Sequence, residues 1–315
     1  MSPTAWACLD HARRSERGPR TTVRLDGLRV GSVDAAGRAA LAAWPAWFRD
    51  GDGGHEGELL IDLPPAGRDR ALAEVHGALR AQGLVRAWRD EPFAWWNERG
   101  EVPAVIERAA SRFWGALTLG AHANGFVADP ATGRPTHLWI ARRAWTKPTD
   151  PGRLDNLVGG GVPHGQTPRQ ALHREAWEEA GLHEHELAGL QRGRTVELAC
   201  DIAEGWQHEW LYVYDLALPP GRVPQNQDGE VAEHRLLPVA DALQRAADGE
   251  MTTDAALATL DFALRHGLLP HDAGLAARFE ALCVAPVQAA AHADPRDPPA
   301  GVSTFSKSET PPQSR

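Results

Sequence analysis

Three glutamates stand close together in the segment GGGVPHGQTPRQALHREAWEEAGL, which covers residues 159–182. Glu175, Glu178 and Glu179 have the spacing i, i+3, i+4, which on a helix places their carboxylates on one face. Like charges at this spacing destabilise a helix by roughly 0.2–0.5 kcal/mol per pair, and near the C-terminal end the helix macrodipole also opposes them. A divalent cation would relieve this repulsion, and carboxylates are typical ligands of Mg²⁺ and Mn²⁺. The alternative is a solvated acidic helix face.

The residues around the glutamates predict the helix that carries them. Thr167 suits the N-cap, Pro168 the first helical position and Gly181 the C-cap. We therefore expect a helix over residues 167–180. The three glycines before it, residues 159–161, allow the backbone to approach a ligand or a metal closely.

The whole segment resembles the Nudix box, whose pattern is G-x5-E-x7-R-E-U-x-E-E-x-G-U with U a bulky aliphatic residue. The resemblance implies a Nudix fold over roughly residues 113–247, a divalent metal, and hydrolysis of a diphosphate linked to another moiety. Two positions differ from the pattern: Gln166 replaces a glutamate, from which we expect a weaker outer metal position, and Ala176 is smaller than usual. The matching positions are Gly160, Arg174, Glu175, Glu178, Glu179, Gly181 and Leu182.

The resemblance also implies roles for individual residues. The three glutamates ligate the metal with Glu179 at the centre, and Arg174 orients Glu175. A carbonyl of Gly159 or Gly160 joins the metal ligands. These are the expected metal-binding residues.

The sequence before the box, residues 136–161, looks like a stretch shared by isopentenyl diphosphate isomerases and a subgroup of Nudix hydrolases. The isomerases carry a catalytic cysteine just before the box glycine, where this chain has Gly159. The hydrolase subgroup resembles the chain from about residue 26 to residue 282 and is similar to the Nudix partner of thiamine pyrophosphokinase. It implies hydrolysis of thiamine diphosphate, or of its damaged oxo- and oxy-derivatives, to the monophosphate. The alternatives are a hydrolase of ADP-ribose-like nucleoside diphosphates and a non-catalytic binding module.

The general base has two candidates, Glu178 and Glu230, since Nudix proteins often bring a late loop carboxylate over the metals. Glu230 and the nearby Glu233 are equally compatible with a solvated strand edge. Arg142 and Lys147 are candidate diphosphate ligands. Alternation along a strand puts Arg142 and Arg143 on opposite faces, so at most one of the two arginines is expected to reach the substrate.

Other residues could bind the organic part of the substrate. His122 and Asn124 lie on one face of a predicted strand and could bond a heterocycle, or could form a buried structural pair. Trp96, with Trp95 beside it, could stack on a cationic ring, for which a tryptophan face contributes roughly 0.5–2 kcal/mol. With 12 tryptophans in the chain, core packing is the competing explanation for each.

The elements that must position these residues suggest an α+β fold. Short extended pieces alternate with helices up to about residue 112, for example a strand over residues 57–63 and a helix over residues 68–83. From residue 113, four β-rich stretches surround the box helix, which is typical of a Nudix α/β/α sandwich with a mixed sheet. We expect three C-terminal helices over residues 239–247, 253–266 and 273–282.

These patterns give a division into domains. Residues 1–20 are polar and arginine-rich, and we expect a disordered tail. Residues 21–112 form a small N-terminal α+β domain, and residues 113–285 form the Nudix domain with its C-terminal helices. Residues 286–315 are rich in Pro, Ser and Thr and are expected to be a second disordered tail.

Composition excludes several kinds of protein. A formal net charge of −9 over 315 residues argues against nucleic-acid and membrane-surface partners, which need basic faces. Three scattered cysteines indicate free thiols in a reducing compartment, and no apolar run approaches a spanning helix. No apolar stretch follows the N-terminal arginines as in a secretory signal. We therefore expect a cytoplasmic protein whose partner is a small organic diphosphate, with a homodimer left open.

Overall fold

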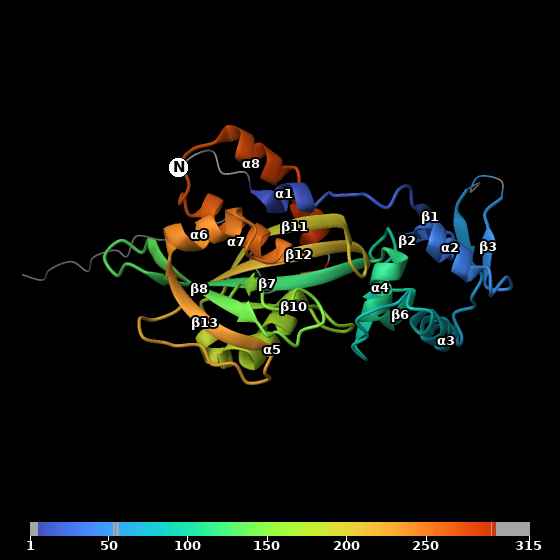
Figure 1. Cartoon of the computed structure of the whole chain (residues 1–315), viewed down its shortest axis with the longest axis horizontal. Helices are drawn as coiled ribbons and strands as arrows, with labels where there is room; N and C mark the ends of the chain where they lie inside the picture. Colours follow the sequence, from blue (N-terminus) through green and yellow to red (C-terminus); the bar gives the residue numbers. More distant parts are fainter. Residues whose placement is uncertain (1–5, 53, 55–56, 291, 294–315) are drawn as a thin grey trace, which may run out of the picture.

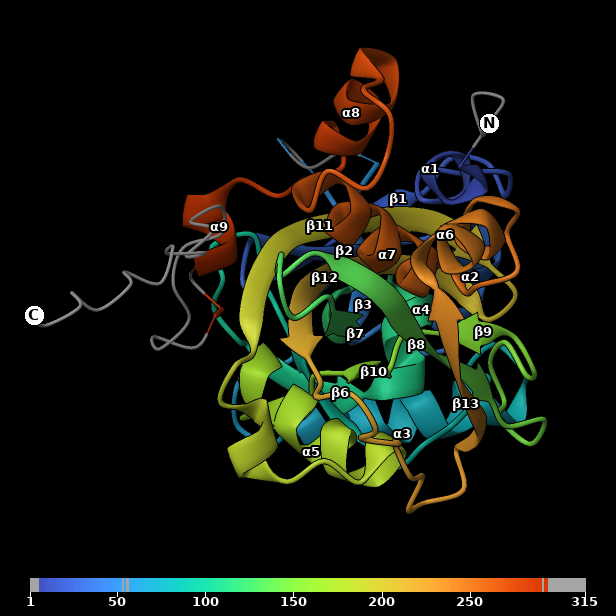
Figure 2. The ribbon, with the colours of Figure 1, turned by 90° about the vertical axis from the view of Figure 1, so that its left-hand side faces the viewer.

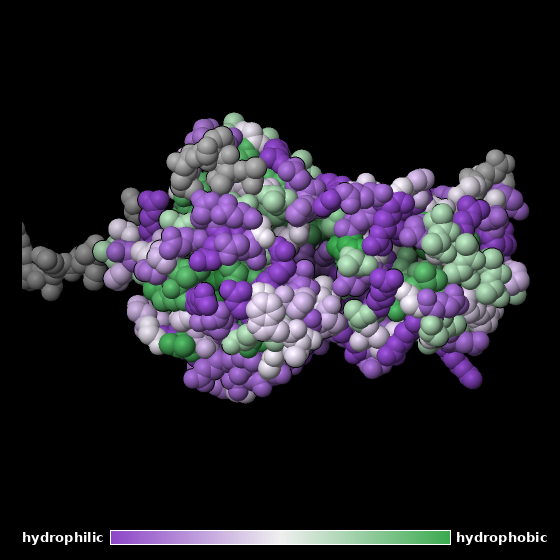
Figure 3. Space-filling model, viewed as in Figure 1, coloured by the Kyte–Doolittle hydropathy of each residue, from purple (hydrophilic) through white to green (hydrophobic). Residues whose placement is uncertain are grey.

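The computed structural model describes residues 6–52, 54, 57–290 and 292–293. Two bodies lie end to end along its longest axis (Figure 1), and a narrower waist joins them on the mostly hydrophilic face seen in Figure 3. We call residues 21–116 the N-terminal unit and residues 117–283 the C-terminal unit. The hydrophobic core of the N-terminal unit includes Phe113, Trp114 and Ala116, so its packing extends slightly beyond the expected boundary at residue 112.

The N-terminal unit is built on a four-stranded sheet with the order β2-β1-β4-β3. Helix α3 buries Leu72, Val75 and Leu79 at helical spacing, as its pattern predicts. A separate two-stranded hairpin, β5-β6, leads into α4. The elements are β1 (Thr21–Leu25), β2 (Leu28–Val33), α2 (Ala35–Leu41), β3 (Phe48–Asp50), β4 (Leu59–Ile61), α3 (Arg68–Ala81), β5 (Pro92–Trp95), β6 (Ala104–Glu107) and α4 (Arg108–Trp114).

The C-terminal unit contains a mixed sheet with the order β11-β12-β7-β8-β13, to which β10 and β9 add on β7 and β8. Strands β7 and β12 pair in parallel, and the other pairs are antiparallel. The elements are β7 (Leu117–Ala128), β8 (Pro135–Arg143), β9 (Leu154–Asp155), β10 (Val158–Gly161), α5 (Pro168–Ala180), η2 (Glu184–Leu187), β11 (Gln191–Ile202), β12 (Gly205–Ala217), β13 (Val231–Pro238), α6 (Val239–Ala247), α7 (Thr253–Arg265) and α8 (Ala273–Glu280), followed by α9 (Pro286–Ala290).

Helices cover both faces of this sheet, as Figure 2 shows with α5 below the strands and α6 and α7 above them. Tyr212 and Tyr214 of β12 pack in the core on the α5 side, whereas Leu211 and Val213 pack with α7. The alternation along β12 therefore serves two cores, one on each face. The predicted fold class, with a mixed sheet and helices on both faces, is confirmed, and so are the three C-terminal helices, with ends that differ by one or two residues.

The chain start differs from the expectation of a disordered tail over residues 1–20. From residue 6 onward it is structured, because α1 (Ala7–His11) packs against α7 and buries Trp6, Cys8 and Leu9. The segment then runs along β11, where the amide of Ala199 donates to the carbonyl of Ala12. The arginine-rich composition of residues 1–20 predicts disorder, although a few apolar residues within it are enough to form a packed helix.

The C-terminal tail expected over residues 286–315 is described only at its beginning. Residues 286–290 form α9, and the carbonyl of Ala289 accepts a hydrogen bond from the hydroxyl of Tyr212 at 2.9 Å. The rest of that prediction, residues 294–315, lies outside the described residues. Among the helices that the structure does describe, none combines the length and the apolar character that crossing a membrane requires.

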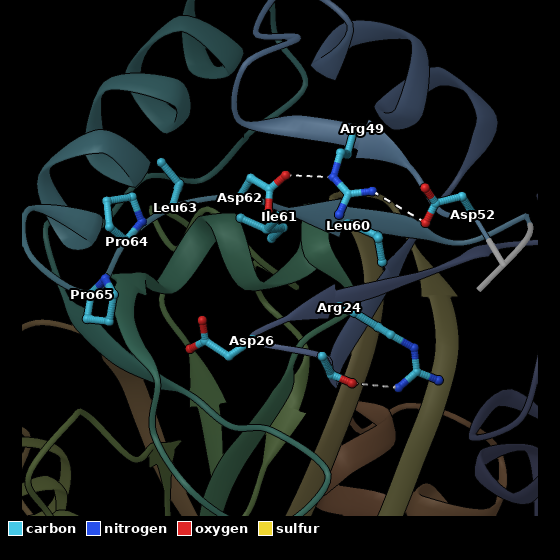
Figure 4. A pocket seen from close by; sticks show the side chains of 11 residues that line it. Arg24, Asp26, Arg49, Asp52, Leu60, Ile61, Asp62, Leu63, Pro64 and Pro65 are labelled. Carbon is cyan, nitrogen blue, oxygen red and sulfur yellow. Dashed lines mark hydrogen bonds and ion pairs between the residues drawn. The ribbon is translucent and has the colours of Figure 1, made fainter. Parts of the chain in front are cut away.

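A pocket of about 570 Å³ opens at the β1–β4 part of the N-terminal sheet. Figure 4 shows Arg49 between Asp52 and Asp62, with Arg24 bonded to the carbonyl of Gly27. Asp26, on its lower wall, pairs with Arg68 at 2.8 Å. The charges of this pocket therefore largely neutralise one another within the protein.

The packing of α1 gives a first prediction. Trp6→Ala should lower the free energy of unfolding by about 3–5 kcal/mol, because the side chain is 2% exposed and its removal leaves a cavity. Urea unfolding followed by circular dichroism measures this change. Trp145→Ala is the matched control. Trp145 is 72% exposed, so its substitution should change the free energy of unfolding little. Equal stabilities of the two variants would mean that α1 is not packed in solution.

Candidate active site

Helix α5 begins and ends at the residues that the sequence indicated. Thr167 and Gln170 form a capping box, in which the Thr167 side chain accepts from the Gln170 amide and the Gln170 side chain accepts from the Thr167 amide. Gly181 ends the helix with φ +62°, a left-handed conformation that favours glycine. A Cβ there would also lie 2.8 Å from the carbonyl oxygen of Gln225. The predicted helix is confirmed.

The three glutamates of α5 differ in exposure and in their partners. Glu179 is 5% exposed and Glu175 is nearly as buried, whereas the Glu178 side chain is 35% exposed. Arg174 donates to Glu175 at 2.8 Å and to Glu178 at 2.7 Å. Its contact with Glu175 agrees with the orienting role that the Nudix resemblance implies.

Lys147 supplies the positive charge beside Glu179. Its ammonium lies 3.6 Å from Glu179 Oε1 and forms an ion pair with Glu230. Lys147, in the loop after β8, therefore links Glu179 of the box to Glu230. Lys147 and Glu230, both selected from the sequence, meet at the box glutamates.

Burial and mutual repulsion shift the protonation equilibria of these carboxylates. Burial raises the pKa of Glu179 to about 8 against the opposing effect of Lys147, and repulsion from Glu175 and Asp155 adds to the shift. Burial likewise raises the pKa of Glu175, which Arg174 partly counteracts and Glu178 reinforces. Added positive charge beside these two groups would favour their ionised forms.

The glycines of β10 allow the glutamates to approach the sheet. The amide of Gly159 donates to Glu179 Oε2 at 2.9 Å. A Cβ on Gly160 would lie 2.3 Å from Glu175 Oε1, and one on Gly159 would lie 2.7 Å from the His122 ring. Any side chain at these two positions would displace a polar group of the site.

The donor set fits a hard divalent cation in its chemistry. Carboxylates of Glu175, Glu178 and Glu179 share one face beside the backbone of Gly159 and Gly160, and such oxygen donors suit Mg²⁺ or Mn²⁺. Gln166, at the box position where the pattern has a glutamate, has a buried Oε1 without a hydrogen-bond partner in the described structure. Within residues 6–52, 54, 57–290 and 292–293, no three His, Cys, Asp or Glu side chains already form a metal-holding group.

Of the two neighbouring arginines on β8, the structure brings Arg143 rather than Arg142 toward this cluster. Arg142 donates to Glu233 at 2.8 Å and to the carbonyl of Gly152. Arg143 forms an ion pair with Asp155 at 2.9 Å, close enough to Glu179 for the two charges to interact. Alternation separates the two arginines as expected, and Arg143, not the predicted Arg142, lies on the side of the box glutamates. Glu233 forms ion pairs with Arg142 and Arg235 and therefore lies on the side of Arg142.

His122 and Asn124 belong to a buried polar network under α7. Asn124 donates to Asp215 and to the carbonyl of Ala258 and accepts from Asn156, so both ends of its amide are used. His122 Nδ1 lies 2.9 Å from Asn156 Oδ1, and its ring borders Gly159. Of the two alternatives, a buried structural role fits Asn124 better than substrate binding. His122 lies at the edge of the site.

Trp95 and Trp96 do not reach the box glutamates. Trp95 is buried in the N-terminal core, where its indole donates to the carbonyl of Val30. Trp96 lies against His292, with ring centroids 4.3 Å apart, in a cavity of about 350 Å³ that Trp210 also lines. Trp96, which directly follows β5, therefore belongs to a separate cavity that the box residues do not line.

Two arginines of the N-terminal unit, Arg89 and Arg108, approach the site and were not predicted. A Cβ on Gly161 would lie 3.1 Å from the Arg108 guanidinium carbon. The charge of Arg108 lowers the pKa of Glu175, and both arginines lower that of Glu230. Nothing local in the sequence marks them, since they lie far before the box and approach it only through the packing of the two units.

Comparison with known proteins shows which proteins are similar to the region that carries this site. A model of the NUDIX domain matches residues 120–256. The chain is 35% identical to Nudix hydrolase 24, chloroplastic, and 33% identical to Nudix hydrolase 20, chloroplastic, both from Arabidopsis thaliana. These matches cover 69% and 70% of this chain, and the chain spans 59% of each relative. The crystal structure of DR0079 from Deinococcus radiodurans is 27% identical with a TM-score of 0.41, over 55% of this chain and 99% of that one.

The glycine strand gives a prediction about metal binding. Gly160→Ala should weaken Mg²⁺ or Mn²⁺ affinity at least tenfold, because the new methyl group would displace the Glu175 carboxylate. Isothermal titration calorimetry with each metal measures the affinity. Gly189→Ala is the matched control, since nothing lies within 4 Å of a Cβ there. An unchanged affinity in Gly160→Ala would exclude Glu175 from the metal ligands.

Proposed function

We propose that the chain is a Nudix hydrolase, a metal-dependent hydrolase of an organic diphosphate, and the match of the NUDIX domain model to residues 120–256 supports this. The observation that carries the proposal is the carboxylate face of α5 against the glycines of β10. Glu175, Glu179 and Gly160 approach closely there, and positive side chains surround them. Such a site suits a substrate with both phosphate oxygens and a metal to bind.

The protein side chains divide the chemistry between them. When bound, a divalent cation held by Glu175, Glu178 and Glu179 would neutralise charge on the diphosphate oxygens. Lys147 lies beside Glu179 and can donate a hydrogen bond to a phosphate oxygen. Water attacks one phosphorus atom, the bridging P–O bond breaks, and a monophosphate and inorganic phosphate are the products.

Glu230 is one of the two candidates for the general base. Although burial opposes it, the hydrogen bond and charge of Lys147 hold the pKa of Glu230 below its ordinary value, so the carboxylate is ionised at neutral pH. Glu178 remains the second candidate. Both carboxylates are partly exposed and bonded to a cation, Glu178 to Arg174 and Glu230 to Lys147, and that cation would have to release the carboxylate before it accepts a proton.

For the substrate we propose thiamine diphosphate or its oxidised derivatives, on the basis of the resemblance to the thiamine-type subgroup. An ADP-ribose-like nucleoside diphosphate is the alternative. Incubating the protein and Mg²⁺ with a panel of both classes tests the choice. Release of thiamine monophosphate should be fastest, and rapid AMP release with negligible thiamine monophosphate would overturn this substrate. A cytoplasmic location and a homodimer remain predictions.

Glu179→Gln distinguishes a hydrolase from a binding module. Loss of the buried metal ligand should lower kcat by about 10³-fold, equivalent to roughly 4 kcal/mol of transition-state stabilisation, while the protein stays folded. Steady-state kinetics and a thermal unfolding curve measure both properties. Glu184→Gln, at an exposed position beyond the helix, is the control. If Glu179→Gln keeps its activity, the box glutamates do not perform the reaction.

Glu230→Gln tests the identity of the base. It should lower kcat by about 10²–10⁴-fold, the usual contribution of a positioned acid or base, and leave metal affinity nearly unchanged. Glu178→Gln should instead weaken metal binding. The reverse pattern would assign the base to Glu178.

A further inference from the structure

Arg108, the first residue of α4, extends from the N-terminal unit to the glycines of β10. Its Nη1 donates to Glu91 at 2.8 Å, and its guanidinium carbon lies 5.3 Å from the centre of the Phe93 ring. The missing side chain of Gly161 makes room for it, since a Cβ there would lie 3.2 Å from Nη2. Its charge acts on both Glu175 and Glu230.

Arg89 approaches the same place from the loop between α3 and β5. Its Nη2 is 3.5 Å from the hydroxyl of Thr149, in the loop that also carries Lys147. Burial, with repulsion from Arg108 and Arg143, lowers the pKa of this guanidinium. In the described part of the chain, no carboxylate lies within ion-pair distance of Arg89.

The loop holds Arg89 in a fixed position. Ala87 and Asp90 have φ values of +57° and +58°, a conformation that residues other than glycine rarely adopt. The Glu107 carboxylate accepts from the amides of Arg89 and Glu91 at 2.8 and 3.0 Å. The indole of Trp88 donates to Asp90 at 2.7 Å.

Three guanidinium groups therefore converge on one side of the site, and their mutual repulsion is only partly offset. Arg108 has Glu91 and Arg143 has Asp155, but Arg89 has a long contact to a hydroxyl. Phosphate matches the forked donors of arginine and would relieve this repulsion. The box glutamates lie close to these arginines, since the charge of Arg108 acts on Glu175 and that of Arg143 interacts with Glu179, so an anion bound there would have both the arginines and the expected metal ligands as neighbours.

We propose that Arg89 and Arg108, together with Arg143, form a phosphate-binding site that the N-terminal unit supplies to the Nudix domain. The ligand is the terminal phosphoryl group of an organic diphosphate, and in this the inference rests on the proposed function. The N-terminal unit is then a part of the active site, and the Nudix domain by itself lacks two of its phosphate ligands. The docking of the β5 strand supports this arrangement, since the amide of His164 donates to the carbonyl of Pro92 at 2.8 Å.

Binding of methylenediphosphonate, whose P–C–P bridge is not hydrolysed, tests the proposal on the full chain. Calorimetry in magnesium-containing buffer should show binding to the wild type that weakens at least tenfold in Arg89→Ala and in Arg108→Ala. Arg89→Lys should fall between, because it keeps the charge and loses the fork. Arg86→Ala is the control, an exposed arginine in the same loop that donates to the carbonyl of Gly83.

The outcomes separate this proposal from the proposed function. Equal diphosphonate affinity in wild type and the two alanine variants would overturn the arginine site, as would no binding to the wild type. Loss of binding in the variants, with no substrate hydrolysed by the wild type, would overturn the hydrolase and leave the phosphate site standing. For an active enzyme, the alanine variants should raise KM for the diphosphate substrate at least tenfold. A thermal unfolding curve for each variant shows whether it remains folded.

Discussion

The crowding of negative charge on one face of α5 is the constraint on which the rest of the site depends. Glu179 is buried and Glu175 is largely buried, and burial and repulsion both disfavour their ionised forms. The surrounding structure supplies positive charge from the helix itself through Arg174 and from the loop after β8 through Lys147. The bare backbone of Gly160 leaves space for the carboxylates. The need to compensate these negative charges thus links α5, the loop after β8 and β10.

The same requirement gives the N-terminal unit a physical role. Its contact with the C-terminal unit brings arginine side chains toward an acidic helix, and opposite charges on two packed surfaces favour one relative orientation. Arg108 fits against Gly161 because no side chain stands there. In the C-terminal unit the carboxylates expected to bind the metal are therefore local to one helix, whereas the phosphate ligands that we propose come from three separate parts of the chain.

Local signals in the sequence were sufficient to predict the helices and strands. They were insufficient to predict the partners of several side chains. The caps of α5 and its periodicity depend on neighbouring residues, so the helix could be predicted to within a residue. Asn124 and Trp95 illustrate the limit. A polar or aromatic residue on a strand needs a partner. Asn124 lies on β7, which is buried on both faces, and Trp95 lies on β5, which is buried from Phe93 to Trp95, so the pattern along one strand does not distinguish a ligand site from a core.

The sequence by itself determined the fold class, the box helix and the set of carboxylates, because capping, periodicity and the i, i+3, i+4 spacing act over a few residues. Only the tertiary structure decided that Arg143 rather than Arg142 faces the cluster, that Lys147 joins Glu179 to Glu230, and that α1 is packed. It alone revealed Arg89 and Arg108. These contacts join residues far apart in the chain, and the free energy that selects them comes from the packing of whole surfaces.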